Sequence, residues 1–128
     1  MEYEISIPKN GDYISIKVNQ PVTADLGRRF AVDAARLAKE QNIKKFLCDV
    51  RNAPNLQSVS EDYFYANTEM DQFGFSKATR SALLVNPDDR SHDFIETAFR
   101  NAGYNVKIFT DESAAISWLN EISKKEGS

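Results

Sequence analysis

Residues 46–50 read Phe-Leu-Cys-Asp-Val, and residues 81–85 read Ser-Ala-Leu-Leu-Val. Both runs are short and mostly apolar, and each is followed by a loop that contains a proline. Such runs are typical of strands that are buried on both faces of a parallel sheet. Because residues 58–73 between them have the pattern of a helix, the two runs predict a β-α-β unit with parallel strands.

Two further strands are predicted upstream of this unit. Residues 3–7 and 13–18 each alternate apolar and polar side chains, which is the period of a half-buried strand. The Asn-Gly pair in the loop between them favours a type I′ turn, so the two strands are expected to form an antiparallel hairpin. A helix is then expected from Thr23, its N-cap, to about residue 41.

The second helix has start and stop signals of its own. Ser58 and Glu61 have the spacing of a capping box, in which the serine hydroxyl and the glutamate carboxylate bond to each other's backbone amides. Gly74 is expected to end this helix near Phe73.

The downstream third of the chain continues the alternation of helix and strand. Residues 94–102 form a helical stripe that Gly103 is expected to stop, and residues 106–109 form a strand. A last helix begins at Thr110 or Asp111. Its expected inner face consists of Ala115, Trp118, Leu119 and Ile122. The order ββαβαβαβα predicts one α/β domain over residues 1–128, with a mostly parallel sheet and an antiparallel edge strand.

Composition and charge indicate an ordinary globular domain and disfavour a nucleic-acid partner. The chain has 128 residues, of which 41% are hydrophobic and 27% charged, close to the average for a single globular domain. Its formal net charge is −3, whereas nucleic-acid binders usually carry a basic excess, so no nucleic-acid partner is expected.

The sequence also indicates a compartment. Cys48 is the only cysteine, so no intrachain disulfide can form, which fits a reducing cytoplasm. The N-terminus lacks the pattern of a signal peptide, and no apolar run approaches the ~18 residues that span a bilayer. We therefore expect a cytoplasmic protein and leave peripheral contact with the inner membrane open.

Catalytic and metal-binding patterns are missing from the sequence. It contains neither a GxGxxG motif nor a P-loop, and a lone His92 with a lone Cys48 cannot supply a zinc site. His92 lies among polar residues at a helix start, so we expect a solvated first-turn residue rather than a base. No enzyme activity, cofactor or metal is predicted.

The second helix carries an excess of aromatic residues. Five of the fourteen aromatic side chains lie between Glu61 and Phe75. Helical spacing places one set on the sheet side: Tyr63, Ala66, Met70 and Phe73. Phe64 and Tyr65 are rotated away from that side. They either pack against a neighbouring helix and the domain edge, or they line a ligand cleft, a dimer contact or a membrane-facing patch.

Charge helps to choose among these alternatives. Residues 58–75 contain four acidic residues and no basic residue; the acidic ones are Glu61, Asp62, Glu69 and Asp71. Anionic lipid headgroups repel such an acidic surface. A cleft for an apolar ligand, or a protein contact, fits this helix better than a membrane does.

Asp49 and Arg51 are the ionisable residues of most interest. They follow the strand at 46–50, and ligand sites in open α/β sheets gather at the carboxyl ends of strands. Arg51 is therefore a candidate to bind the carboxylate or phosphate head of a ligand. The alternative is that Asp49 caps the loop and Arg51 pairs with it.

Three features together resemble a known family. They are the ββαβαβαβα order, the strand end Asp49-Val50-Arg51, and residues 109–119, Phe-Thr-Asp-Glu-Ser-Ala-Ala-Ile-Ser-Trp-Leu. The chain resembles the small SpoIIAA-like proteins of bacteria, which are related to STAS domains and more distantly to the CRAL-TRIO lipid-binding fold. The resemblance implies a non-enzymatic α/β domain that binds a small ligand, a nucleotide, a lipid or a protein partner.

The resemblance also points to a candidate phosphorylation site. In anti-sigma-factor antagonists of the STAS type, a serine in an Asp-Ser-Ser-Gly-like turn before the second helix is phosphorylated. Ser58 and Ser60 lie in that region, but the aspartate and the glycine of the motif are missing. Glu61 and Asp62 would oppose a phosphate there.

Two functional hypotheses follow. The first is a binding module for a small apolar or amphipathic, lipid-like ligand, with peripheral membrane association left open. The expected ligand-binding residues are Asp49, Arg51, Tyr63, Phe64, Met70, Phe73 and Phe75. The second is a regulatory protein-interaction domain, or a homodimer, that uses the second helix as its contact face. An enzyme that depends on Asp49, Arg51 and Ser58 ranks below both.

Overall fold

The computed structural model describes residues 2–9 and 11–121 of the chain. Its centre is a five-stranded sheet in which the strands lie side by side in sequence order. They are β1 (Tyr3–Ser6), β2 (Ile14–Val18), β3 (Lys45–Asp49), β4 (Arg80–Leu84) and β5 (Asn105–Phe109). β1 pairs antiparallel with β2, and every other pairing is parallel. The predicted mixed sheet with an antiparallel edge strand is confirmed. Asn10 of the expected turn and Ile122 of the expected last helix lie outside the described residues.

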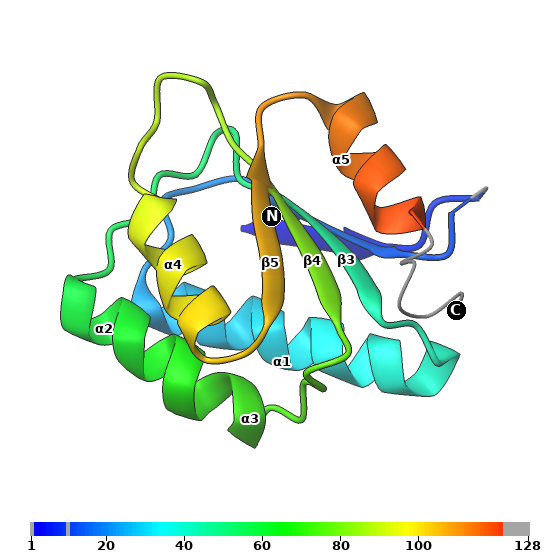
Figure 1. Ribbon diagram of the computed structural model, residues 1–128, viewed down its shortest axis with the longest axis horizontal. Coiled ribbons are helices and arrows are strands. Elements are labelled where there is room, and N and C mark those ends of the chain that lie inside the picture. The colour runs from blue at the N-terminus through cyan, green and yellow to red at the C-terminus, as the bar shows by residue number, and fades with distance from the viewer. Residues whose placement is uncertain (1, 10, 122–128) are drawn as a thin grey trace.

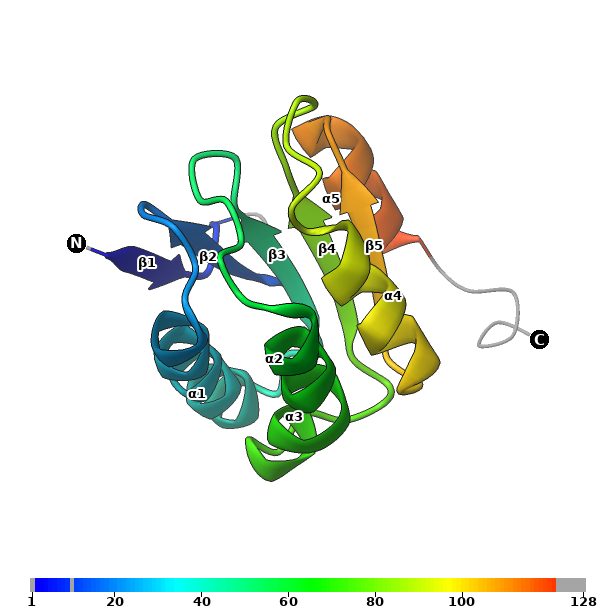
Figure 2. The same cartoon turned by 90° about the vertical axis from the view of Figure 1, so that its left-hand side faces the viewer.

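The helical segments cover the sheet unequally (Figures 1 and 2). They are α1 (Ala24–Gln41), α2 (Val59–Phe64), the π-helix η1 (Tyr65–Glu69), α3 (Met70–Gln72), α4 (Asp93–Asn101) and α5 (Glu112–Asn120). Right-handed crossovers between strands that advance in one direction place every crossover helix on the same face. α1, the α2–η1–α3 segment and α4 accordingly share one face of the sheet, and α5 covers the other.

Each face of the sheet has its own hydrophobic core. On the α5 face, Leu47 of β3 and Leu84 of β4 pack against Ala115 and Leu119. The larger core lies on the opposite face, where side chains from β2 to β5 meet α1, η1 and α4. Alternation along β3 distributes its side chains between the two cores, since successive strand residues point to opposite faces.

The predicted helix ends are confirmed. The hydroxyl of Thr23 and the carboxylate of Asp111 accept hydrogen bonds from backbone amides at the starts of α1 and α5. Ser58 forms the full capping box with Glu61 at the start of α2. Gly74 and Gly103 follow their helices with φ of +90° and +97°, a left-handed conformation that favours glycine. These boundaries could be predicted because each depends on side chains within a few residues of the helix end.

The second helix departs from its prediction in the middle. Residues Tyr65–Glu69 form a π-helix, in which the amide of Met70 bonds to the carbonyl of Tyr65. Tyr65 is only 6% exposed, whereas Tyr63 is 61% exposed. The buried residues of the segment follow the i, i+3, i+4, i+7, i+8 spacing of a helix stripe, and they are Asp62, Tyr65, Ala66, Glu69 and Met70. The prediction that Tyr63 faces the sheet was wrong, and Tyr65, which was expected off that side, is buried instead. Ala66 and Met70 are buried as predicted.

The acidic character of this helix is also smaller at the surface than the sequence predicts. Asp62 and Glu69 are buried, so only Glu61 and Asp71 of the four carboxylates are exposed. Glu69 forms an ion pair with Arg28 of α1 at 3.1 Å. The helix is thus held to α1 by charge as well as by apolar packing.

Candidate functional site

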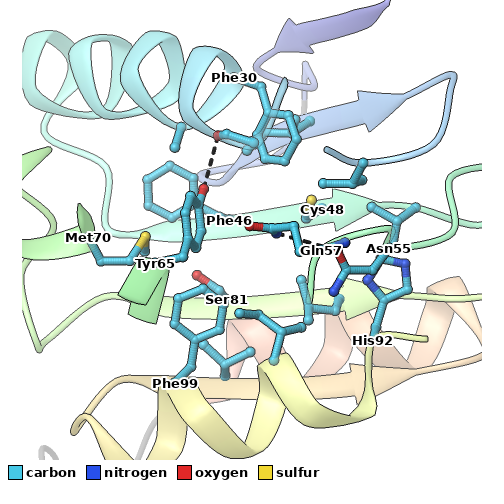
Figure 3. A pocket seen from close by; sticks show the side chains of 18 of the residues that line it. Phe30, Phe46, Cys48, Asn55, Gln57, Tyr65, Met70, Ser81, His92 and Phe99 are labelled. Atoms are coloured by element: carbon cyan, nitrogen blue, oxygen red, sulfur yellow. Dashed lines mark hydrogen bonds between the residues drawn. The ribbon is translucent and has the colours of Figure 1, made fainter. Parts of the chain in front are cut away.

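A pocket of about 100 Å³ lies in the larger core, between the sheet and the helices α1, η1 and α4 (Figure 3). Its walls are mainly aliphatic and aromatic. The apolar lining includes Ile16, Val22, Phe30, Phe46, Val50, Tyr65, Met70, Phe75, Leu83, Ile95, Phe99 and Val106. An apolar cavity with a few polar groups is the usual form of a small-molecule site.

Tyr65 forms the wall on the helix side. Its hydroxyl donates a hydrogen bond to the carbonyl oxygen of Gly27 in α1 at 3.0 Å, and its ring meets Phe73 and Phe99 edge-on at about 6 Å. Burial raises the pKa of this phenol, so the hydroxyl stays a donor. Lining a cleft was one of the alternatives that the sequence left open for Tyr65, although the predicted set of ligand-binding residues omitted it.

Polar groups gather at one end of the pocket. Asn55 Nδ2 donates to both carboxylate oxygens of Asp62, at 3.0 and 3.3 Å. Asn55 Oδ1 accepts from the Gln57 amide at 3.1 Å and from Gln57 Nε2 at 3.3 Å. The buried carboxylate, the asparagine and the glutamine therefore form one relay that ends in the pocket.

The last atom of this relay has no partner. Gln57 Oε1 is buried, and no donor among the described residues bonds to it. In Figure 3 this oxygen extends away from Asn55 toward the side of the pocket where Phe46 and Tyr65 lie. A buried acceptor left unsatisfied typically costs about 1–3 kcal/mol. Among the described residues, Gln57 Oε1 and the Tyr104 hydroxyl are the buried side-chain atoms without a partner, and of the two only Gln57 lines the pocket.

His92 also lines this end of the pocket. It is buried, and its Nε2 donates to the carbonyl oxygen of Ala53 at 2.9 Å. The prediction of a solvated first-turn residue was wrong, because the loop after β3 folds over the start of α4. This contact joins loops that are far apart in the sequence, and the polar neighbours of His92 gave no sign of it.

The buried carboxylate of Asp62 is perturbed by its surroundings. Burial raises its pKa, and the hydrogen bonds from Asn55 oppose the rise only in part. The sequence placed Asp62 on an exposed acidic face, whereas the structure uses it to orient Asn55.

Cys48 supplies part of the sheet wall of the pocket. The thiol is buried, and burial raises its pKa to about 12, so very little reactive thiolate is present near neutral pH. Cys48 therefore contributes packing rather than reactivity to the pocket wall.

Asp49 and Arg51 lie apart from the pocket. Cys48 and Val50 point into the larger core, so Asp49 between them faces the α5 side. The Arg51 guanidinium donates two hydrogen bonds of 3.0 and 2.7 Å to the Asp49 carboxylate and forms an ion pair with Glu112 at 3.2 Å. Burial would raise the pKa of Asp49, but the hydrogen bonds from Arg51 outweigh it and the net pKa is lowered. The structure thus has the pairing that the sequence left as the alternative.

The sheet also lacks the reversal of strand order on which the prediction of a ligand site at Asp49 and Arg51 depends. Ligand crevices in open α/β sheets form where the strand order reverses. Here the order follows the chain from β1 to β5 without reversal.

The predicted ligand-binding residues are therefore divided among three places. Met70 and Phe75 line the pocket, and Phe73 packs beside it on the ring of Tyr65. Tyr63 and Phe64 are exposed on the outside of the helix. The predicted set omitted four other residues that line the pocket: Asn55, Gln57, Tyr65 and His92. Composition and periodicity offered no signal for Asn55, Gln57 and His92, whereas Tyr65 was left open as a cleft residue.

The two candidate phosphorylation sites lie at the start of α2. The hydroxyl of Ser58 accepts the Glu61 amide at 3.1 Å as part of the capping box, and Ser60 is exposed in the first turn. In residues 2–9 and 11–121, no group of three or more metal-ligating side chains is close enough to hold a metal. Within the same residues, no helix is long and apolar enough to cross a membrane.

Comparison with known proteins identifies the fold. No protein-family model and no curated protein match the chain. Its structure is similar to that of an uncharacterized protein of the DUF3478 family with a SpoIIAA-like fold, from Shewanella loihica PV-4. The match has a TM-score of 0.52 and 17% sequence identity, and it covers 91% of each chain. The predicted resemblance is confirmed at the level of the fold, and this chain has a SpoIIAA-like fold.

Proposed function

We propose that this SpoIIAA-like domain is a non-enzymatic binding module that takes a small, mainly apolar ligand into the pocket between its sheet and η1. The observation that carries the proposal is the apolar pocket with a buried, unpartnered Gln57 Oε1 at its polar end. Proteins rarely leave such an acceptor unsatisfied inside a core.

The size of the pocket sets the class of ligand. Its volume of about 100 Å³ is below the roughly 300 Å³ at which pockets for drug-sized ligands begin. A dry engineered cavity of about 150 Å³ takes benzene. This pocket is smaller than that cavity, so a single six-membered ring such as benzene, phenol or toluene enters it with some displacement of the lining side chains. A lipid chain requires the α2–η1–α3 segment to move away from the sheet.

A regulatory role fits the position of the pocket. Tyr65 and Met70 touch the pocket from the same helical segment that exposes Tyr63 and Phe64 on its outer side. A ligand that changes the packing of η1 thus acts on a segment that also offers a surface to a partner.

Methyl NMR tests the proposal directly. Toluene added to the protein should shift the methyl signals of Val50, Leu83 and Ile95, which line the pocket. The methyl groups of Leu47 and Leu119 in the α5-side core provide an internal control and should stay in place. Absence of saturable shifts up to the solubility of toluene, or equal shifts in both cores, would contradict the proposal.

A second candidate function rests on a separate observation. Four large apolar side chains near the start of α2 are more than half exposed, and we call them the α2 patch: Leu56, Val59, Tyr63 and Phe64. Clusters of this kind often mark interaction sites. Exposed Glu61 and Asp71 on the same segment, without a basic residue, favour a protein partner over an anionic membrane.

The simplest form of this second function is a homodimer through the α2 patch. Sedimentation velocity should then show a concentration-dependent dimer that is lost in Phe64→Asp and kept in Val32→Asp, a matched change at an exposed site on α1. A monomer at all concentrations would contradict the homodimer. Binding to phosphatidylglycerol vesicles that Phe64→Asp abolishes would favour membrane contact in its place.

A further inference from the structure

We infer that the ligand of the pocket is a neutral hydrogen-bond donor, such as a small alcohol, a phenol or an N–H heterocycle, whose proton bonds to Gln57 Oε1. The inference rests on the proposed function, and it adds the polarity and charge of the ligand. It follows from the direction of the hydrogen-bond relay at the polar end of the pocket.

The orientation of Asn55 is fixed from two sides. Its Nδ2 faces the Asp62 carboxylate and also lies 3.4 Å from the carbonyl oxygen of Ser91, and both of these groups accept. Its Oδ1 faces the backbone amide of Gln57, which can only donate. The side-chain amide of Asn55 therefore cannot be reversed without losing bonds at both ends.

The orientation of Asn55 in turn fixes Gln57. Because Asn55 Oδ1 is an acceptor, the Gln57 group beside it at 3.3 Å must be the Nε2 donor. Oε1 is then the atom left buried without a partner. The pocket consequently presents an acceptor to its ligand, and the complementary ligand group is a donor.

The charge of the ligand follows from the lining. No lysine or arginine lines the pocket within the described part of the chain, and the nearest charged group of the relay is the carboxylate of Asp62. A carboxylate or phosphate ligand would meet Gln57 Oε1 without a lysine or arginine to compensate its charge, and His92, the imidazole in the lining, already bonds through Nε2 to the carbonyl oxygen of Ala53. An ammonium ion would lose its hydration among apolar walls. A neutral O–H or N–H donor avoids both costs.

Phenol and toluene form the matched pair of probes, because they have the same shape and differ in one donor. The ratio of the toluene Kd to the phenol Kd is measured by methyl NMR titration in the native protein and in Gln57→Leu. We expect the ratio to fall about fivefold in Gln57→Leu, which corresponds to one ordinary hydrogen bond. Gln72→Leu, the same substitution at an exposed position of α3, should leave the ratio unchanged.

Measurements on the native protein keep the test valid if Gln57→Leu does not fold. Phenol should shift the side-chain amide signals of Gln57 further than toluene or anisole does, because only phenol adds a hydrogen bond to the ring-current effect, and benzoate should bind at least tenfold more weakly than phenol. An unchanged ratio in Gln57→Leu, a Gln57 signal that phenol moves no further than toluene does, or preferred binding of benzoate would each overturn the inference. If toluene also fails to bind, the proposed function fails; if toluene binds and the phenol results are negative, only the inference fails.

Discussion

Neighbouring residues of β3 have different fates because they point to different faces of the sheet. Cys48 joins the pocket wall, whereas Asp49 pairs with Arg51 on the α5 side. The sequence predicted Asp49 as a candidate ligand-binding residue, but it did not show that Asp49 lies on the opposite side of the sheet from the pocket. A carboxylate two residues from an arginine at a strand end is equally compatible with a ligand site and with a local ion pair, and only the packing around them distinguishes the two.

Replacing Arg51 with methionine should reveal the contribution of this pair. Arg51 is partly exposed, so we expect a loss of about 0.5–1 kcal/mol of unfolding free energy at pH 7. The pKa of Asp49 is lowered in the folded state, so the stabilisation is present above the unfolded pKa near 4 and disappears as the pH falls through the folded pKa. Urea unfolding at pH 7 and at successively lower pH measures this difference.

The control for this experiment is Arg36→Met, which removes a more exposed partner of Asp33. It should change the unfolding free energy by no more than a few tenths of a kcal/mol. A difference between Arg51→Met and the native protein that stays constant from pH 7 to below the pKa of Asp49 would show that lost packing, rather than lost charge, is responsible.

At the scale of elements, the α2–η1–α3 segment presents to the core a side that includes Tyr65 and not Tyr63. It turns Tyr65 inward, toward Gly27 and Phe99, and leaves Tyr63 outside. Capping signals predicted where this helix starts and where it stops. They could not predict the π turn, because the residues of η1 carry no distinctive local pattern and the turn is stabilised by contacts with α1 and α4.

Aspartate substitutions at the two tyrosines should show which of them is buried. Tyr65→Asp places a charge in the core and removes a large side chain, so we expect a loss of at least about 3 kcal/mol, close to global unfolding. Tyr63→Asp should change the unfolding free energy by about 0.5 kcal/mol or less. Urea titration followed by circular dichroism measures both. Equal losses, or a greater loss at Tyr63, would contradict the arrangement.

At the scale of the whole molecule, Asn55 connects three segments that are distant in sequence. Asn55 forms a parallel β-bridge with Val22 before α1, and its backbone amide donates to Ser91 Oγ before α4. Its side-chain Nδ2 donates to the carboxylate of Asp62 in α2. The loop after β3 is therefore fastened to the starts of all three crossover helices, and this arrangement closes the polar end of the pocket.

Asn55→Leu should destabilise the protein by about 1–3 kcal/mol at pH 7, because Asp62 loses its donors while it stays buried. The pKa of Asp62 is already raised by burial, and removal of Asn55 should raise it further. The folded state then binds the proton more tightly than the unfolded state, so stability falls as the pH rises from about 4. The deficit of the variant should accordingly shrink as the pH is lowered.

Chemical denaturation between pH 4 and pH 7 measures this effect, and Asn52→Leu at an exposed position of the same loop is the matched control. A deficit in Asn55→Leu that does not depend on pH would show that Asp62 is not the group affected. The same variant should weaken the phenol preference of the pocket, since it frees the orientation of Gln57.

The strands, the helix ends and the order of elements could be predicted from the sequence, because each depends on residues close to one another in the chain. Alternation specified the two hairpin strands, short apolar runs specified the buried strands, caps and glycines specified the helix ends, and the ββαβαβαβα order led to the SpoIIAA-like fold. The tertiary structure alone decided which side chains meet. It turned Tyr65 inward and buried His92 through bonds to Gly27 and Ala53, which lie 38 and 39 positions away. It also directed Gln57 Oε1 into the pocket, because Asn55, which orients Gln57, is itself held by Ser91, 36 positions away.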